Sequence, residues 1–369
     1  MASDDVNNAD RQQPAPPESA EQMPRVRVTR ARVIASLLFV VGIVAFLYFG
    51  LPKLVGLGET LRRLRHGNAW WLGAAAALEA LSFGGYIALF RAVFVHRTAR
   101  IGWRTSYEIT MAGLAATRLF AAAGAGGIAL TAWALRHAGM DRRTVAARMV
   151  AFMALLYGVY MAALFVDGFG LFLGLWPGSA PIAITVVPAI FGGVVILLFL
   201  AISALPGDFD RLVSARSQGQ GLGGRIARRV AAVPSAAAIG VRTGIELMRS
   251  RDPGLLGAIA WWGFDIATLW ACFHAFGYSP DTGIVVMAYF VGWIANTLPL
   301  PGGIGGVEGG MIGAFTAFGV SVQAAVVAVL AYRAFSFWLP TLPGGVAYLQ
   351  LRRTVNRWRS SEAPAVSGA

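Results

Sequence analysis

Long apolar runs constrain this chain more than any other feature of its sequence. A helix needs about 20 predominantly apolar residues to cross the hydrocarbon core of a bilayer. Only 13% of the 369 residues are charged, about half the share that is usual in soluble domains. Six segments are long enough: 33–51, 69–90, 144–166, 181–205, 254–277 and 321–349. We therefore predict an all-α polytopic membrane protein, with its last span kinked at Pro340 and Pro343.

Two further apolar regions, 105–139 and 283–319, are interrupted by glycine clusters. Each splits into arms of about 14–17 residues, which are too short to span a bilayer alone. Irregular backbone at membrane depth is tolerated only where protein buries it or where it lines a cavity. We therefore expect about six full transmembrane helices plus two broken, re-entrant helical hairpins.

The two interrupted regions resemble one another. The segment ATRLFAAAGAGGIA (Ala116–Ala129) aligns without gaps on ANTLPLPGGIGGVE (Ala295–Glu308), and the shared residues are mostly glycines. Chance matching in an Ala/Gly-rich sequence is the alternative explanation. An inverted repeat would place a substrate site near the middle of the membrane, where the broken helices meet.

The distribution of basic residues predicts the orientation in the membrane. The formal net charge is +13, and Lys53 is the only lysine among 31 basic residues. If the N-terminus is cytoplasmic and the hairpins enter from opposite sides, most arginines fall in cytoplasmic segments, as the positive-inside rule requires. The basic loop at 52–68 goes against this orientation. We expect a multi-pass protein of the cytoplasmic (inner) membrane with both termini in the cytoplasm.

This topology divides the chain into two membrane halves with flanking cytoplasmic segments. The predicted parts are a disordered tail (1–24), a first half with hairpin 105–139 (25–205), an Arg-rich linker with an interfacial helix (206–253), a second half with hairpin 283–319 (254–350) and a second tail (351–369). The first span follows a basic segment but has no small-residue cleavage site after it, so we expect it to be retained.

Composition also argues against several classes of partner and cofactor. The basic charge lies in loops beside apolar spans, which suits anionic lipid headgroups better than nucleic acid. A single cysteine, Cys272, leaves no internal disulfide. The four histidines form no close pair, so we expect neither a metal site nor a cofactor.

The stretch PLPGGIGGVEGG, residues 299–310, combines helix breakers with one carboxylate. Glu308 would lie in the first turn of the helix that follows, where the helix N-terminus stabilises a negative charge. The exposed N–H groups of that turn could instead receive a lipid phosphate. Arg333, in the next span, is a candidate phosphate contact or counter-ion for Glu308. The alternative is purely structural: the glycines permit close packing, and Glu308 caps its helix or pairs with Arg333. The candidate residues of the tip are Pro301, Gly302, Gly303, Gly305 and Gly306.

Four other polar residues are candidates for the same site. Arg118 lies beside the first hairpin tip, where it could contact a headgroup or snorkel to the membrane surface. Asn296 precedes the second tip and could hydrogen-bond to broken backbone. Glu79 and Asp265 are carboxylates in the middle of spans, where ionisable groups either relay protons or pair with arginines.

The pattern PGGIGGVE (Pro301–Glu308), followed by Gly319 and then Arg333, resembles the lysylphosphatidylglycerol synthase transmembrane-domain family, which consists of flippase-like integral membrane proteins. The resemblance covers most of residues 30–355, but only this motif region is specific. In the family the first half often carries a related Pro…Gly-Glu pattern, whereas Phe120 and Ala129 stand at those places here. This departure disfavours a symmetric mechanism with two carboxylates. The resemblance implies the lipid-handling membrane region, and we expect this chain to lack the soluble synthase domain.

Three classes of function fit these features to different degrees. A translocase for anionic phospholipids or lipid-linked precursors explains the broken helices and their charges. The alternative is a non-catalytic partner of a lipid-modifying or glycan-modifying enzyme. An intramembrane enzyme is less favoured, because the sequence lacks Gly-x-Ser-x-Gly and His-Glu-x-x-His. We therefore expect no enzymatic activity, and the sequence does not predict an oligomeric state.

Overall fold

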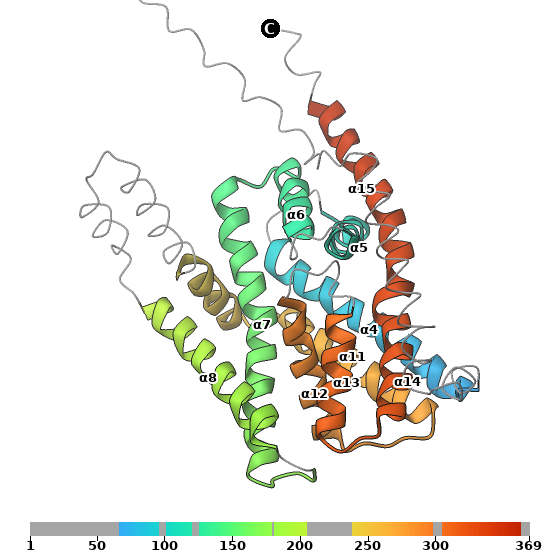
Figure 1. Ribbon diagram of the computed structural model, residues 1–369. Helices are drawn as coiled ribbons and strands as arrows, with labels where there is room; N and C mark the ends of the chain where they lie inside the picture. The colour runs from blue at the N-terminus through green and yellow to red at the C-terminus, as the bar shows by residue number, and fades with distance from the viewer. Residues whose placement is uncertain are drawn as a thin grey trace, which may run out of the picture.

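The computed structural model describes residues 66–95, 101–119, 125–178, 181–204, 238–297 and 305–362, and these ranges are helical with turns between the helices (Figure 1). Within these described ranges, five helices are long and apolar enough to cross a membrane. They are α4 (Ala69–Phe94), α7 (Arg142–Phe172), α8 (Ile182–Ala204), the combined η2 (Pro253–Leu256) and α11 (Gly257–Ala275), and the final run that covers Val322–Trp358. They confirm the predicted all-α polytopic membrane protein, and the predicted span at 33–51 lies outside the described residues.

Each of the two interrupted regions forms a pair of short helices that pack against one another. The four helices have 17, 13, 13 and 12 residues, so at about 1.5 Å per residue none reaches the roughly 30 Å of a hydrocarbon core. They are α5 (Trp103–Leu119) with α6 (Ala125–His137), and α12 (Thr282–Ile294) with α13 (Gly306–Ala317), the 3₁₀ turn η3 (Ala295–Thr297) following α12. The break at 120–124 and most of the second break, 298–304, lie outside the described residues.

The two halves share a common order of elements with matching landmarks. Helices α4 to α7 correspond to α11 to α14 (Val322–Arg333). After the second short helix of each half comes a glycine with positive φ, 95° at Gly139 and 87° at Gly319. Two residues later, Asp141 and Ser321 cap the next helix by accepting a backbone N–H. Figure 1 shows the α6–α7 connection at one end of the bundle and the α13–α14 connection at the opposite end. This arrangement agrees with an inverted repeat.

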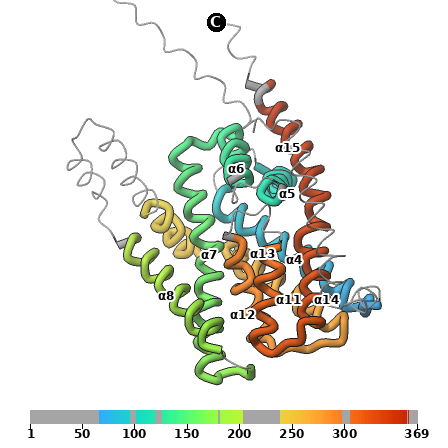
Figure 2. The backbone as a smooth tube through the Cα atoms, in the orientation of Figure 1, coloured from blue at the N-terminus to red at the C-terminus, as the bar shows by residue number. Residues whose placement is uncertain are grey.

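The repeat also governs how the halves pack. Helix α4 packs on α11 across the centre, α12 packs on α7, and α5 packs on α15 (Leu339–Glu362). Each broken hairpin therefore contacts a long helix of the other half. The α4–α11 contact is close because it lacks side chains at one point: a Cβ added to Gly257 would lie 2.2 Å from the backbone oxygen of Gly85. Figure 2 shows α8 on the outer side of α7.

The last span contains a π-helical segment, η5 (Ala334–Trp338), between α14 and α15. Pro340 has no backbone N–H, so it cannot close the α-helical hydrogen bond to the carbonyl group of Ser336. Pro343 lies inside α15. The irregularity therefore lies next to the two prolines that led us to expect one.

Helix α15 continues to Glu362, so the boundary predicted at 350 falls inside a helix. Leu351 and Val355 are fully buried on one face of this extension. The Thr354 hydroxyl donates a hydrogen bond to Glu108 Oε2 in α5 at 2.8 Å. Of the predicted linker, residues 206–237 lie outside the described residues, and 238–249 form a helix.

Candidate functional site

A buried ion pair joins the second hairpin to the last span. Arg333 Nε donates to Glu308 Oε1 at 2.7 Å, and the two residues are 3% and 2% exposed. The Arg333 guanidinium also lies over the ring of Phe337, 4.6 Å from its centroid. Its Nη2 atom is buried without a hydrogen-bond partner. The guanidinium group thus retains donor capacity beyond its contact with Glu308.

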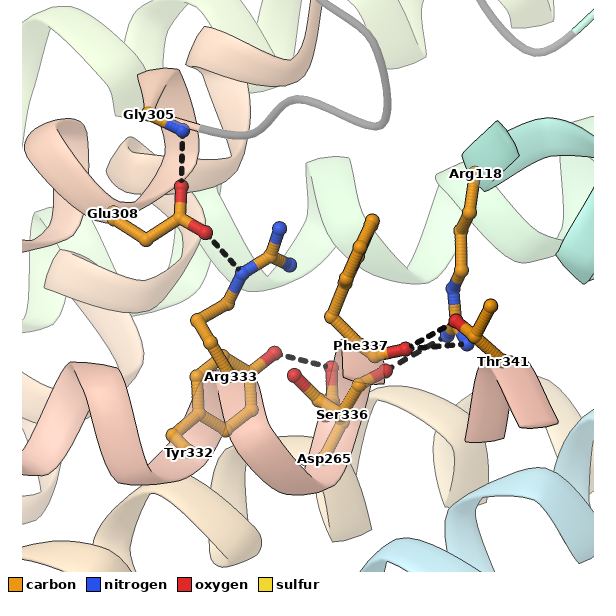
Figure 3. A network of polar contacts seen from close by, with 9 residues as sticks. All are labelled: Arg118, Asp265, Gly305, Glu308, Tyr332, Arg333, Ser336, Phe337 and Thr341. Carbon is orange, nitrogen blue, oxygen red and sulfur yellow. Dashed lines mark hydrogen bonds and ion pairs between the residues drawn. The ribbon is translucent and has the colours of Figure 1, made fainter. Parts of the chain in front are cut away.

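The glycine-rich tip sets the position of Glu308. Gly305 has φ 84°, a left-handed conformation that favours glycine, and α13 begins at the next residue. Glu308 is then the third residue of the helix, and its Oε2 accepts a hydrogen bond from the Gly305 N–H at 2.7 Å. One carboxylate oxygen therefore caps the helix while the other binds Arg333, as Figure 3 shows. The two structural roles weighed from the sequence are both present.

Arg118, in the last turn of α5, points inward toward the π-helical segment (Figure 3). Its Nη2 donates to the Ser336 carbonyl oxygen at 2.8 Å, and its Nη1 donates to the Phe337 carbonyl oxygen at 3.4 Å. The Ser336 oxygen is available because Pro340 supplies no N–H to it. Arg118 therefore binds uncharged backbone oxygens and does not snorkel to the membrane surface.

Arg118 and Arg333 both line a cavity of about 510 Å³ between the two halves. This volume is within the range of sites that hold small organic ligands. The rest of the polar lining includes Asn296, Thr117, Thr131 and Ser336. Aromatic rings from both halves form much of the wall: Tyr86, Phe90, Phe94, Phe152, Tyr157, Tyr160, Phe191, Trp261, Trp262, Trp293 and Phe337.

The cavity opens on an apolar flank of the molecule. Three of its lining residues, Ile128 in α6, Tyr157 in α7 and Phe191 in α8, are 42%, 44% and 50% exposed. Neighbouring side chains on α8 that are also exposed are all apolar, including Val187, Ile190, Val194, Leu197 and Leu198. A surface of this composition on a membrane helix faces hydrocarbon. Among the described residues, the rim of the cavity at Ile128, Tyr157 and Phe191 therefore adjoins an apolar surface of the kind that contacts lipid.

Two carboxyl groups face each other across the α4–α11 contact beside the cavity. Glu79 and Asp265 are 4% and 3% exposed, and the two carboxyl groups are close enough to interact electrostatically with one another. Asp265 Oδ2 accepts hydrogen bonds from the hydroxyls of Tyr289 and Tyr332, the latter at 2.9 Å. Arg118 is close enough to interact electrostatically with both carboxyl groups. The hydrogen-bond partners of Asp265 are thus tyrosines rather than an arginine.

The predicted candidates therefore gather in one region as far as the structure describes them. Glu308 and Arg333 pair directly, and Arg118 and Asn296 share the cavity with Arg333. Gly305 and Gly306 form the start of α13, whereas Pro301, Gly302 and Gly303 lie outside the described residues. In the described part of the chain, no group of three or more His, Cys, Asp or Glu side chains could hold a metal ion.

Sequence reasoning missed the tyrosines and the backbone acceptors of this site. Tyr332 precedes Arg333 directly, so its position beside the candidate arginine was a usable signal. Tyr289 had no such signal, because a tyrosine inside an apolar helix usually only packs. The Ser336 carbonyl could have been inferred from Pro340 four residues later, but nothing in the sequence identified Arg118 as its donor.

Most of this chain matches one known protein family. The family model described as "Lysylphosphatidylglycerol synthase TM region" matches residues 33–344. The chain belongs to this family. All five charged residues of the site, Glu79, Arg118, Asp265, Glu308 and Arg333, lie within the matched range. The resemblance seen in the PGGIGGVE motif is thereby confirmed.

Three matches are to proteins described as UPF0104 membrane proteins. A UPF0104 membrane protein of Methanothermobacter thermautotrophicus is 24% identical over 328 residues, covering 85% of this chain and 94% of the relative. A shorter match to a protein of the same description and organism is 33% identical over 109 residues, covering 29% of this chain and 31% of the relative. A UPF0104 membrane protein of Methanocaldococcus jannaschii is 30% identical over 95 residues, covering 26% and 28%. These relatives support a membrane protein of the lysylphosphatidylglycerol synthase TM family.

Proposed function

We propose that this protein translocates lipids with anionic headgroups between the leaflets of a bilayer. The observation that carries the proposal is a cavity lined by two arginines that opens on a lipid-facing flank. A headgroup with a phosphate would enter the cavity while its acyl chains remain in the hydrocarbon. Anionic phospholipids and lipid-linked precursors share this chemistry.

The two arginines are suited to a phosphate because each has donors to spare. A guanidinium group carries five N–H donors and binds phosphate oxygens in pairs. Arg118 donates two hydrogen bonds to uncharged carbonyl oxygens. Arg333 uses Nε on Glu308, and its Nη2 has no partner. A phosphate between them would satisfy a buried donor that is otherwise left unpaired.

The aromatic wall suits the part of the lipid next to the phosphate. Rings such as Trp262 and Tyr160 present large apolar faces with a polar edge. In the protein these edges are already satisfied: Trp262 Nε1 donates to the Leu156 carbonyl oxygen at 2.8 Å, and the Tyr160 hydroxyl donates to the Phe290 carbonyl oxygen at 2.7 Å. These two rings therefore present apolar faces toward the cavity, which fits glycerol and acyl carbons.

The paired broken hairpins provide a route for the headgroup to both leaflets. In membrane transporters built from inverted repeats, one repeat moves against the other around a site near the middle of the membrane. Here the cavity has walls from both halves, and the hairpins approach it from opposite ends. We place the protein in the cytoplasmic membrane with both termini in the cytoplasm, following the distribution of arginines.

A reconstitution assay tests the proposal. The full chain is reconstituted in phosphatidylcholine vesicles that contain a trace of phosphatidylglycerol with a fluorescent label near its headgroup. A membrane-impermeant quencher then measures the fraction of this labelled lipid in the outer leaflet. We expect labelled phosphatidylglycerol to exchange between leaflets faster than in protein-free vesicles. Rates equal to those of protein-free vesicles for phosphatidylglycerol and for a polyprenyl phosphate would contradict the proposal.

Matched variants separate translocation from a scaffolding role. Arg118→Gln should abolish exchange, because glutamine has no positive charge for a phosphate. Arg104→Gln is the control, since Arg104 is 78% exposed and its ion pair with Glu108 lies away from the cavity. A protein that only scaffolds an enzyme would give the same exchange rate with both variants.

A further inference from the structure

The carboxyl groups of Glu79 and Asp265 lie opposite one another because of the way that the antiparallel helices α4 and α11 are aligned. On α4, Ala75, Glu79 and Ser82 lie on one face at helical spacing. One turn from the carboxyls, Thr268 Oγ1 of α11 donates to the Ala75 carbonyl oxygen at 3.4 Å. One turn in the other direction, Ser82 Oγ donates to the Trp261 carbonyl oxygen at 2.8 Å. These contacts fix Glu79 opposite Asp265 in a region with almost no solvent exposure.

Each of these carboxyl groups has one oxygen without a hydrogen-bond partner. The atoms are Glu79 Oε2 and Asp265 Oδ1. Two adjacent carboxylates in a buried site repel one another, whereas a proton shared between them turns one group into an O–H donor for the other. A single proton would therefore remove the repulsion and satisfy a buried oxygen at the same time.

The charge balance of the site also favours one bound proton. The ionisable groups that interact here come from five helices of the described residues: Glu79 on α4, Arg118 on α5, Asp265 on α11, Glu308 on α13 and Arg333 on α14. Tyr289, Tyr332 and Cys272 also face the carboxyl pair. Three carboxylates and two guanidinium groups leave one excess negative charge, and one proton cancels it. A net charge in a low-dielectric interior is costly.

We propose that Glu79 and Asp265 form a proton-binding site that is coupled to the movement of the anionic headgroup. The coupling rests on the function proposed above, whereas the proton site does not. A headgroup bound between Arg118 and Arg333 adds a negative charge to the cluster, and this addition favours a retained proton. By reciprocity, the bound proton favours the headgroup. The lipid and the proton therefore move in the same direction.

The contacts supply a path between the two sites. Asp265 accepts a hydrogen bond from Tyr332, and Arg333 follows Tyr332 directly on α14. Arg118 interacts electrostatically with both carboxyl groups and lines the cavity. Loss of the proton would increase the attraction of the carboxyl pair for these cations. This stronger attraction would weaken the contacts of Arg118 and Arg333 with the headgroup.

Infrared difference spectroscopy tests the proton site without any transport measurement. The full chain in vesicles should show, near neutral pH, the carbonyl-stretch band of a protonated carboxyl group, shifted in deuterated water. Glu79→Gln and Asp265→Asn should each remove a component of this band. Glu108→Gln is the control, since this buried carboxylate has a donor on each oxygen, from Arg104 and Thr354. A wild-type protein without the band, or a band that both variants leave unchanged, would overturn the proton site.

A pH gradient across the same vesicles tests the coupling. We expect labelled phosphatidylglycerol to accumulate in the leaflet that faces the alkaline compartment, and Glu79→Gln to abolish this accumulation. Accumulation toward the acidic side, or exchange that ignores the gradient, would refute the coupling. A complete absence of exchange would instead count against the proposed function, and the infrared result on the proton site would stand.

Discussion

The ion pair between Glu308 and Arg333 should be far more sensitive to the loss of one partner than to the loss of both. Arg333 Nε lies 2.7 Å from Glu308 Oε1, and both residues are almost fully buried. Removing one partner of such a pair leaves an uncompensated buried charge, which costs about 3–5 kcal/mol. Replacing both charged groups by uncharged ones of similar volume is often nearly neutral.

Glu308→Gln and Arg333→Met isolate the charge. Glutamine keeps an oxygen for the Gly305 N–H, so helix capping survives. Methionine has a similar length to the arginine stem and can pack on Phe337. Each single variant should lower the free energy of unfolding by about 3–5 kcal/mol. The double variant should be more stable than either single variant.

Denaturation of the purified protein in mixed micelles, followed by tryptophan fluorescence, measures these free energies. Arg104→Met is the control, because its ion pair with Glu108 at 3.1 Å involves an arginine that is 78% exposed. Loss of Arg104 should cost less than loss of Arg333, because water screens the exposed guanidinium group and Thr354 still donates a hydrogen bond to the buried Glu108. If the double variant lost the sum of the two single effects, Glu308 and Arg333 would not be energetically coupled, and our account of the pair would be wrong.

Three further predictions concern packing, the π-helical segment and the lipid opening. Gly257→Ala should destabilise the protein by about 1–3 kcal/mol, because the added Cβ would lie 2.2 Å from the backbone oxygen of Gly85. Gly263→Ala on the same helix is the control: its added Cβ meets nothing within 4 Å, so it should be neutral or stabilising in the same unfolding assay. Arg118→Ala should cost about 1–3 kcal/mol by leaving a carbonyl oxygen unpaired, and adding Pro340→Ala should recover part of that loss by supplying an N–H. Tyr157 is 44% exposed at the cavity opening, and the variant Tyr157→Cys should react with a lipid-soluble maleimide faster than with a charged one. The wild-type chain should react with neither reagent, because its single cysteine, Cys272, is buried.

The spans and part of the site could be predicted from the sequence, because exposing a long apolar run to water or leaving a charge unpaired in the membrane carries a large free-energy penalty. A run of about 20 apolar residues has few alternatives to a membrane helix. A carboxylate such as Glu308 in a glycine-rich break is equally constrained, since the membrane interior requires it to have a partner. Arg333 was the nearest basic residue in the following helix. The requirement for a partner therefore limited the candidate counter-ions of Glu308 to a few residues, among them Arg333.

Most of the remaining features depend on tertiary contacts that no local sequence pattern indicates. Arg118 binds carbonyl oxygens 218 and 219 residues away, where α5 crosses the last span. The aromatic wall could not be distinguished from core packing, because the same residue types serve both purposes. The extension of α15 past 350 was detectable, since the buried Leu351 and Val355 are four residues apart among exposed arginines. The density of charge there suggested a tail instead.

The exchange of packing partners between the two halves has a consequence for biogenesis. Helix α5 is complete before translation reaches α15, and the hydrogen bond from Thr354 to Glu108 links residues 246 positions apart. During synthesis α5, with its buried Glu108 and its inward-pointing Arg118, is therefore made before the helix that packs against it. We therefore expect the packing of α5 to be completed only after α15 has been synthesised.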